Sequence, residues 1–106
     1  MTATPDISPS EAAALAAKGA RIVDIREPQE WASGVIPGAA RAPLSVLQSV
    51  DIGAQPQQTL IFHCKGGART RANDAALRAK AEGHDVYLMQ GGIDGWRAAG
   101  LPVAQG

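Results

Sequence analysis

The chain of 106 residues is 45% hydrophobic and carries ten basic and ten acidic side chains, which predicts one ordinary globular domain, residues 1–106, with a core of its own. Because the charges cancel, nothing in the sequence suggests nucleic acid or an anionic membrane surface as a partner. One cysteine excludes an internal disulfide, and the two histidines form no zinc-binding pattern with it, so we expect no metal and no cofactor.

The N-terminal residues 1–6 have neither the basic nor the apolar segment of a secretory signal. No stretch of the sequence approaches the roughly 20 apolar residues that a membrane span needs. With the single unpaired cysteine, these features favour a reducing, cytoplasmic setting.

The first half of the chain predicts one long helix and several short elements. Ser8 and Glu11 form a capping box with a proline between them, and alanine-rich residues continue the helix through Lys18 until Gly19 ends it. A buried strand should follow at residues 21–25, then a short helix begun by Pro28 and a loop at residues 34–38. After these we expect a short strand at residues 40–43, a helix at residues 46–50 with a capping box of Ser45 and Gln48, and a surface turn at residues 55–58.

The second half alternates between strand and helix. Residues 60–63 carry mostly apolar or aromatic side chains that favour a strand, and residues 70–82 should form a helix closed by Gly83. Residues 85–89 predict the last strand and residues 93–99 a terminal helix. Alternation of strands and helices favours a parallel sheet with helices on both faces, which is an α/β fold.

Cys64 lies at the carboxyl end of a predicted strand, where ligands bind in open parallel sheets. The glycines at 66–67 allow a tight curl that can turn successive N–H groups towards an anion. This cradle, the helix expected to start at Thr70, and the cations Lys65 and Arg69 all favour thiolate over thiol. The loop therefore predicts a nucleophilic cysteine in an anion cradle, which on these features alone suits a phosphatase or an oxidoreductase equally well.

Other polar and aromatic residues have simpler structural explanations. His63 should point to the opposite face of the strand from Cys64 and pack in the sheet, rather than act as a base. Asp24 and Arg26 favour a structural ion pair. His84 is expected to be solvated, and Trp31 and Trp96 to pack beside helices. The polar face of the helix after the loop should carry Arg71, Arg78 and Lys80, of which Arg71 alone is near enough to add positive potential at the loop.

Three segments in this order resemble the rhodanese (thiosulfate sulfurtransferase) family: residues 30–39 (EWASGVIPGA), 64–69 (CKGGAR) and 91–96 (GGIDGW). Residues 24–26 also fit, and residues 42–47 and 95–103 are similar to the soluble N-terminal domain of bacterial membrane-anchored rhodaneses, although we expect no anchor here. Val35 stands where the first signature usually has histidine, which puts local hydrogen bonding in doubt. Four residues separate Cys64 from Arg69, whereas phosphatases of this fold have five, and the smaller cradle suits a sulfane sulfur better than a phosphate.

The resemblance implies a three-layer α/β fold with a central, mainly parallel sheet of five strands. It implies a sulfurtransferase that forms a persulfide on Cys64, with a small anionic sulfur donor such as thiosulfate and a thiol or cyanide as acceptor. Two alternatives stay open: a persulfide carrier between protein partners, and a non-enzymatic binding module. The implied donor-binding residues are Lys65, Gly66, Gly67, Ala68, Arg69 and Thr70. Within this set we expect Lys65 to attract the donor and Arg69 to brace the loop.

Overall fold

The computed structural model describes residues 4–106. In this part of the chain, five strands form one sheet in the order β1-β5-β4-β2-β3, and every neighbouring pair is parallel. The strands are Asp6–Ile7 (β1), Arg21–Asp24 (β2), Ala40–Arg41 (β3), Leu60–His63 (β4) and Val86–Met89 (β5). The expected parallel α/β sheet is confirmed. Residues 1–3, part of the stretch tested above for a secretory signal, lie outside the described residues.

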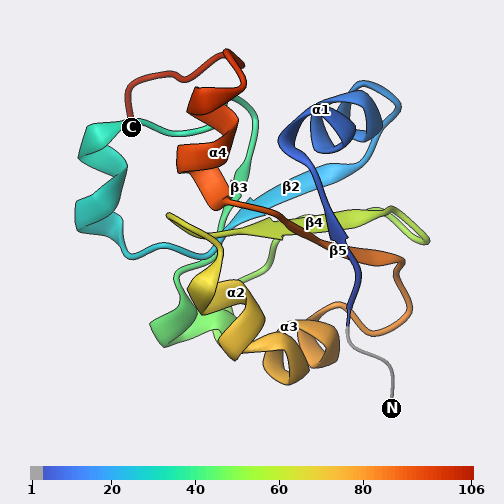
Figure 1. Ribbon diagram of the computed structural model, residues 1–106. Coiled ribbons are helices and arrows are strands. Elements are labelled where there is room, and N and C mark those ends of the chain that lie inside the picture. The colour runs from blue at the N-terminus through green and yellow to red at the C-terminus, as the bar shows by residue number, and fades with distance from the viewer. Residues whose placement is uncertain (1–3) are drawn as a thin grey trace.

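Helices cover both faces of this sheet (Figure 1). One face carries Pro9–Ala17 (α1) and Gly92–Ala98 (α4), and the other carries Leu44–Ser49 (η2), Ala68–Ala72 (α2) and Asp74–Lys80 (α3). A 3-10 helix, Pro28–Ser33 (η1), lies beside the carboxyl end of the sheet. None of the helices in residues 4–106 combines the length and the apolar character that a bilayer span requires.

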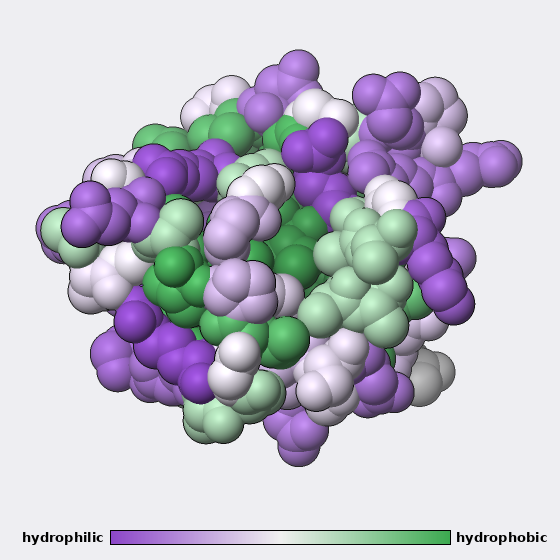
Figure 2. Space-filling view, turned by 90° about the horizontal axis from the view of Figure 1, so that it is seen from above, coloured by the Kyte–Doolittle hydropathy of each residue, from purple (hydrophilic) through white to green (hydrophobic). Residues whose placement is uncertain are grey.

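The central strand β4 is buried on both faces, which explains its nearly continuous apolar sequence. Leu60, Phe62 and Cys64 belong to the core cluster on the face of η2 and α3. Ile61 belongs to the cluster on the face of α1 and α4, together with Trp96. Viewed from the side of α1 and α4, hydrophobic residues gather at the centre of the surface and hydrophilic residues surround them (Figure 2). The alternation along β4 thus carries Cys64 into the core at the strand end.

The capping box of the first helix is confirmed. The backbone N–H of Glu11 donates to Ser8 Oγ at 3.1 Å, and the N–H of Ser8 donates to Glu11 Oε1 at 2.9 Å. The helix α1 ends at Ala17 with Lys18 as its C-cap, and Gly19 follows with a φ of +107°. Local sequence chemistry is sufficient here because all of these groups lie within one or two turns.

The bounds and the continuity of the predicted helix over residues 70–82 are wrong. The helical segment begins at Ala68, ends at Lys80 and is divided at Asn73 into α2 and α3. Asn73 has φ −114° and ψ 24°, and its side-chain amide donates to the carbonyl of Arg69 at 2.8 Å. Asparagine forms such local bonds to the backbone in competition with regular helix, which accounts for the break.

Two smaller predictions also fail, and one short strand was not predicted. The capping box of Ser45 and Gln48 is absent from the described contacts of η2, since Ser45 Oγ donates to Glu27 Oε1 at 2.7 Å and Pro43 precedes the helix. His84 is half-buried, with Nδ1 2.8 Å from the carbonyl oxygen of Gln58, rather than solvated. The strand β1 was not located in the sequence, because a strand of two residues has no period to detect.

Candidate active site

The loop after β4 curls back on the sulfur of Cys64. The backbone N–H of Gly67 donates to Cys64 Sγ at 3.1 Å. Gly67 has φ +98° and caps the start of α2, a left-handed conformation that glycine adopts at little cost. Cys64 is only 1% exposed. One backbone N–H of the loop, that of Gly67, therefore points at the sulfur.

Thr70 supports this curl from the first turn of α2. Its side chain is buried, and its hydroxyl donates to the carbonyl oxygen of Gly67 at 3.0 Å. The same hydroxyl oxygen lies 4.0 Å from Cys64 Sγ. The N–H of Gly67 is hydrogen-bonded to the sulfur and its carbonyl to Thr70, so Thr70 helps to hold the loop around Cys64.

The Gly91–Gly92 pair brings the start of α4 against the backbone of the loop. The N–H groups of Ile93 and Asp94 donate to the carbonyl oxygens of Cys64 and Lys65 at 2.9 and 3.0 Å. A Cβ at Gly92 would lie 2.5 Å from both of these oxygens, and Gly92 has φ +56°. Only glycine permits this approach, so the C-terminal signature packs directly on the active-site loop.

Arg69 is held by Glu30 of η1 through two parallel hydrogen bonds, each 2.7 Å long. A planar guanidinium binds a carboxylate in this bidentate way. These hydrogen bonds lower the pKa of Glu30 from 4.5 to about 2. They also raise the pKa of Arg69, and Cys64 contributes a smaller effect in the same direction. The pair links α2 to η1 across the end of the sheet.

A buried ionic cluster lies beneath the loop. Arg26 is 1% exposed, and it donates to Asp24 at 2.8 Å and to the carbonyl oxygen of Gly34 at 2.8 Å. The predicted structural ion pair of Asp24 and Arg26 is confirmed. His63 is fully buried, with Nδ1 3.0 Å from the carbonyl oxygen of Cys64 and Nε2 3.7 Å from Asp24 Oδ2. Burial lowers the pKa of His63 against the opposing effect of Asp24, which agrees with its assignment as a packed sheet residue.

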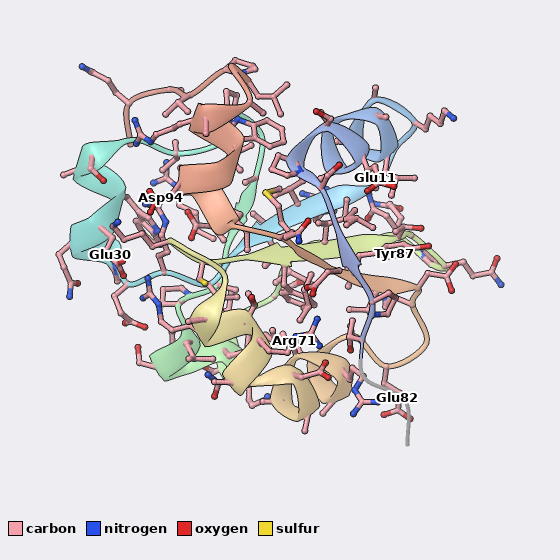
Figure 3. All side chains as sticks on the ribbon, viewed as in Figure 1. Glu11, Glu30, Arg71, Glu82, Tyr87 and Asp94 are labelled. Carbon is pink, nitrogen blue, oxygen red and sulfur yellow. The ribbon has the colours of Figure 1, made fainter. Side chains whose placement is uncertain are left out.

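Lys65 and Asp94 form an exposed ion pair at the loop, with 2.9 Å between Nζ and Oδ2. The labelled Glu30 and Asp94 lie on η1 and α4, both near the carboxyl end of β4 (Figure 3). Arg71, expected to add potential at the loop, is paired with Asp6 at 2.7 Å. Three of the cations that follow Cys64 in sequence therefore each have an acidic partner.

The predicted site residues, 64–70, form the loop after β4 and the first turn of α2. Cys64 and Thr70 are buried, Gly67 and Arg69 are half-buried, and the others are exposed: Lys65, Gly66 and Ala68. The sequence did not assign roles to Glu30, Gly92 or Asp94, although all three lie inside the signature segments. Within the described residues, no three His, Cys, Asp or Glu side chains are grouped to hold a metal ion.

Comparison with known proteins agrees with the signature segments. A family model described as "Rhodanese-like domain" matches residues 8–99. The chain is 35% identical over 92 residues to the thiosulfate sulfurtransferase GlpE of Ectopseudomonas mendocina, covering 87% of this chain and 84% of that protein. It is 33% identical over 85 residues to the HTH-type transcriptional regulator Rv0324 of Mycobacterium tuberculosis, covering 80% of this chain but only 38% of the regulator.

A solved structure adds similarity in three dimensions. The crystal structure of thiosulfate sulfurtransferase from Pseudomonas aeruginosa superposes with a TM-score of 0.82 at 30% identity. The match covers 99% of this chain and 20% of that chain.

Proposed function

Because the chain belongs to the rhodanese-like domain family, we propose that it is a sulfurtransferase that moves a sulfane sulfur from thiosulfate or a similar donor to a thiophilic acceptor. The proposed carrier of the sulfur is Cys64. The observation that supports this most directly is the loop itself, in which the N–H of Gly67 points at Cys64 Sγ from 3.1 Å. A backbone N–H in that position stabilises negative charge on sulfur.

The first proposed step loads the enzyme. The Cys64 thiolate attacks the outer sulfur of thiosulfate, a new S–S bond forms, and the S–S bond of the donor breaks. Sulfite leaves with the electron pair of that bond, and the terminal sulfur of the Cys64 persulfide carries the negative charge of the former thiolate. Lys65 attracts the anionic donor, and the loop N–H groups stabilise the charge that develops.

The second proposed step returns the enzyme to its starting state. A thiol or cyanide attacks the terminal sulfur, the persulfide S–S bond breaks, and the Cys64 thiolate leaves. Cyanide then departs as thiocyanate. The donor and acceptor never occupy the site as a ternary complex, which gives ping-pong kinetics.

Donor access forms part of the proposal, because Cys64 is only 1% exposed. Attack requires contact between Sγ and the donor, so the exposed Lys65 side chain and Gly66 must move aside while Gly67 keeps its N–H on the sulfur. These residues are suited to moving, since Lys65 and Gly66 are exposed. Arg69 stays anchored through Glu30, which limits the movement to the first half of the loop.

The test is intact mass after incubation with thiosulfate, for the native chain and for Cys64→Ser. Addition of one sulfur only when Cys64 is present supports the proposal. No adduct with thiosulfate or with an alkanethiosulfonate overturns it and favours a binding module. Many equivalents of thiocyanate per Cys64, formed with excess thiosulfate and cyanide, indicate an enzyme, whereas a persulfide carrier yields no more than the one equivalent with which it is loaded.

A further inference from the structure

We propose that Asp94 sets the selectivity of this site against anionic reagents by competing with them for Lys65. The inference rests on the proposed function and deepens it, because it names a specificity-determining residue for the sulfur donor. Asp94 lies on α4, 29 positions from Lys65 in sequence, and no signature chemistry assigns it a role.

The backbone fixes the Asp94 carboxylate beside the loop. The N–H of Asp94 donates to the carbonyl oxygen of Lys65 at 3.0 Å, while the N–H of Ile93 donates to the carbonyl oxygen of Cys64 at 2.9 Å. The two residues are thus joined twice, since Lys65 Nζ also lies 2.9 Å from Asp94 Oδ2. A carboxylate held in this way remains at the loop whether or not Lys65 stays bound to it.

Lys65 is the cation of the loop whose partner is most easily exchanged. Its side chain is 67% exposed and that of Asp94 is 51% exposed, so water solvates both when they separate. Arg69 has two bonds of 2.7 Å to the less exposed Glu30. The buried Arg26 is bound to Asp24. An incoming anion can therefore recruit Lys65 at much lower cost than it can recruit either arginine.

The pair also determines the local charge that an anion meets. A lysine ammonium and an aspartate carboxylate in contact sum to zero, so an anion must displace Asp94 or share Lys65 with it. An uncharged reagent has no such competition. Loss of the Asp94 charge should consequently favour anions selectively, and a dianion such as thiosulfate more than a monoanion.

Alkylation of Cys64 tests this selectivity independently of sulfur transfer. Iodoacetate and iodoacetamide are nearly equal in size and differ by one negative charge. With either reagent the sulfur forms a bond to carbon and iodide leaves. Because Cys64 is the only cysteine, intact mass follows the reaction unambiguously. The measured quantity is the iodoacetate rate constant divided by the iodoacetamide rate constant, which cancels changes in the intrinsic reactivity of the sulfur.

Asp94→Asn is expected to raise this ratio about two- to fivefold at low ionic strength, the range set by exposed ion pairs. High salt should reduce the increase. Asp85→Asn, an equal charge change at an exposed position before β5, should leave the ratio unchanged. For thiosulfate, a dianion, Asp94→Asn should lower KM by a larger factor than it raises this ratio, with little change in kcat.

A double-mutant cycle separates competition from simple repulsion. In the Lys65→Ala background, Asp94→Asn should change the ratio by less than half as much, on a logarithmic scale, as in the native background. An equal effect in both backgrounds overturns competition, and an unchanged ratio in Asp94→Asn overturns any selectivity role. Either result leaves sulfur transfer to be judged by thiosulfate loading, so the two proposals can fail separately.

Discussion

Replacing Glu30 with glutamine should loosen the attachment of the active-site loop to η1. The carboxylate has its pKa lowered from 4.5 to about 2, chiefly by Arg69, and each unit of lowering corresponds to about 1.4 kcal/mol. The side chains are 35% exposed for Arg69 and 26% for Glu30, so solvent screens part of the interaction. After this discount we expect Glu30→Gln to reduce the free energy of unfolding by about 1–2 kcal/mol at neutral pH.

The pH dependence gives the sharper test. Because the pKa of Glu30 is lower in the folded protein, its stabilising effect is complete above pH 4.5 and is lost as pH falls from 4.5 to about 2. The stability difference between native protein and Glu30→Gln should therefore be constant from pH 7 to pH 5 and shrink below pH 4.5. Urea unfolding followed by tryptophan fluorescence at a series of pH values measures it.

Glu82→Gln provides the control, since Glu82 is exposed in the turn that follows α3. Its stability difference from the native protein should be small at every pH. The reasoning is refuted if Glu30→Gln unfolds at the same urea concentration as the native protein at pH 6, or if its deficit persists unchanged at pH 3. Either outcome means that the charge of Glu30 does not hold Arg69 in the folded state.

Four further substitutions, one of them a control, test packing and helix capping, each by urea unfolding. Gly92→Ala should cost at least about 2 kcal/mol, because the added Cβ would meet two loop carbonyl oxygens at 2.5 Å. Gly66→Ala, whose Cβ meets nothing within 4 Å, should cost little by comparison. Ser8→Ala should cost about 1 kcal/mol through loss of the Glu11 cap while leaving thiosulfate loading unchanged. Phe62→Ala should cost about 3–5 kcal/mol, since Phe62 is fully buried, and a cost below 1 kcal/mol would contradict the placement of β4 at the core.

The departure at Val35 illustrates the limit of reading a signature residue by residue. In the described contacts, the N–H and carbonyl of Val35 form two bonds of 2.8 Å with the backbone of Ala104. The position is 6% exposed. Hydrogen bonding there is carried by the backbone, which any residue other than proline supplies. Sequence could not reveal this, because the partner lies 69 positions along the chain.

Local chemistry explains which elements could be anticipated. The cap at Ser8, the apolar run from Leu60 and the glycines around Cys64 all act on neighbours within a few residues, so their outcome is decided by sequence. The break at Asn73 is also local, but helix propensity competes with one side-chain bond there. The two tendencies are similar in strength, so the sequence alone does not predict whether the helix continues through Asn73.

The sequence by itself determined a parallel α/β fold and a cysteine at a strand end followed by a curled, basic loop. The tertiary structure decided which acidic side chain pairs with each cation of that loop. Glu30 and Asp94 are 39 and 29 positions from their partners Arg69 and Lys65. Ion pairs across such separations depend on how η1 and α4 pack against the sheet, and no local pattern encodes them. The electrostatics of the loop thus belongs to the fold, while the cysteine and its glycines belong to the sequence.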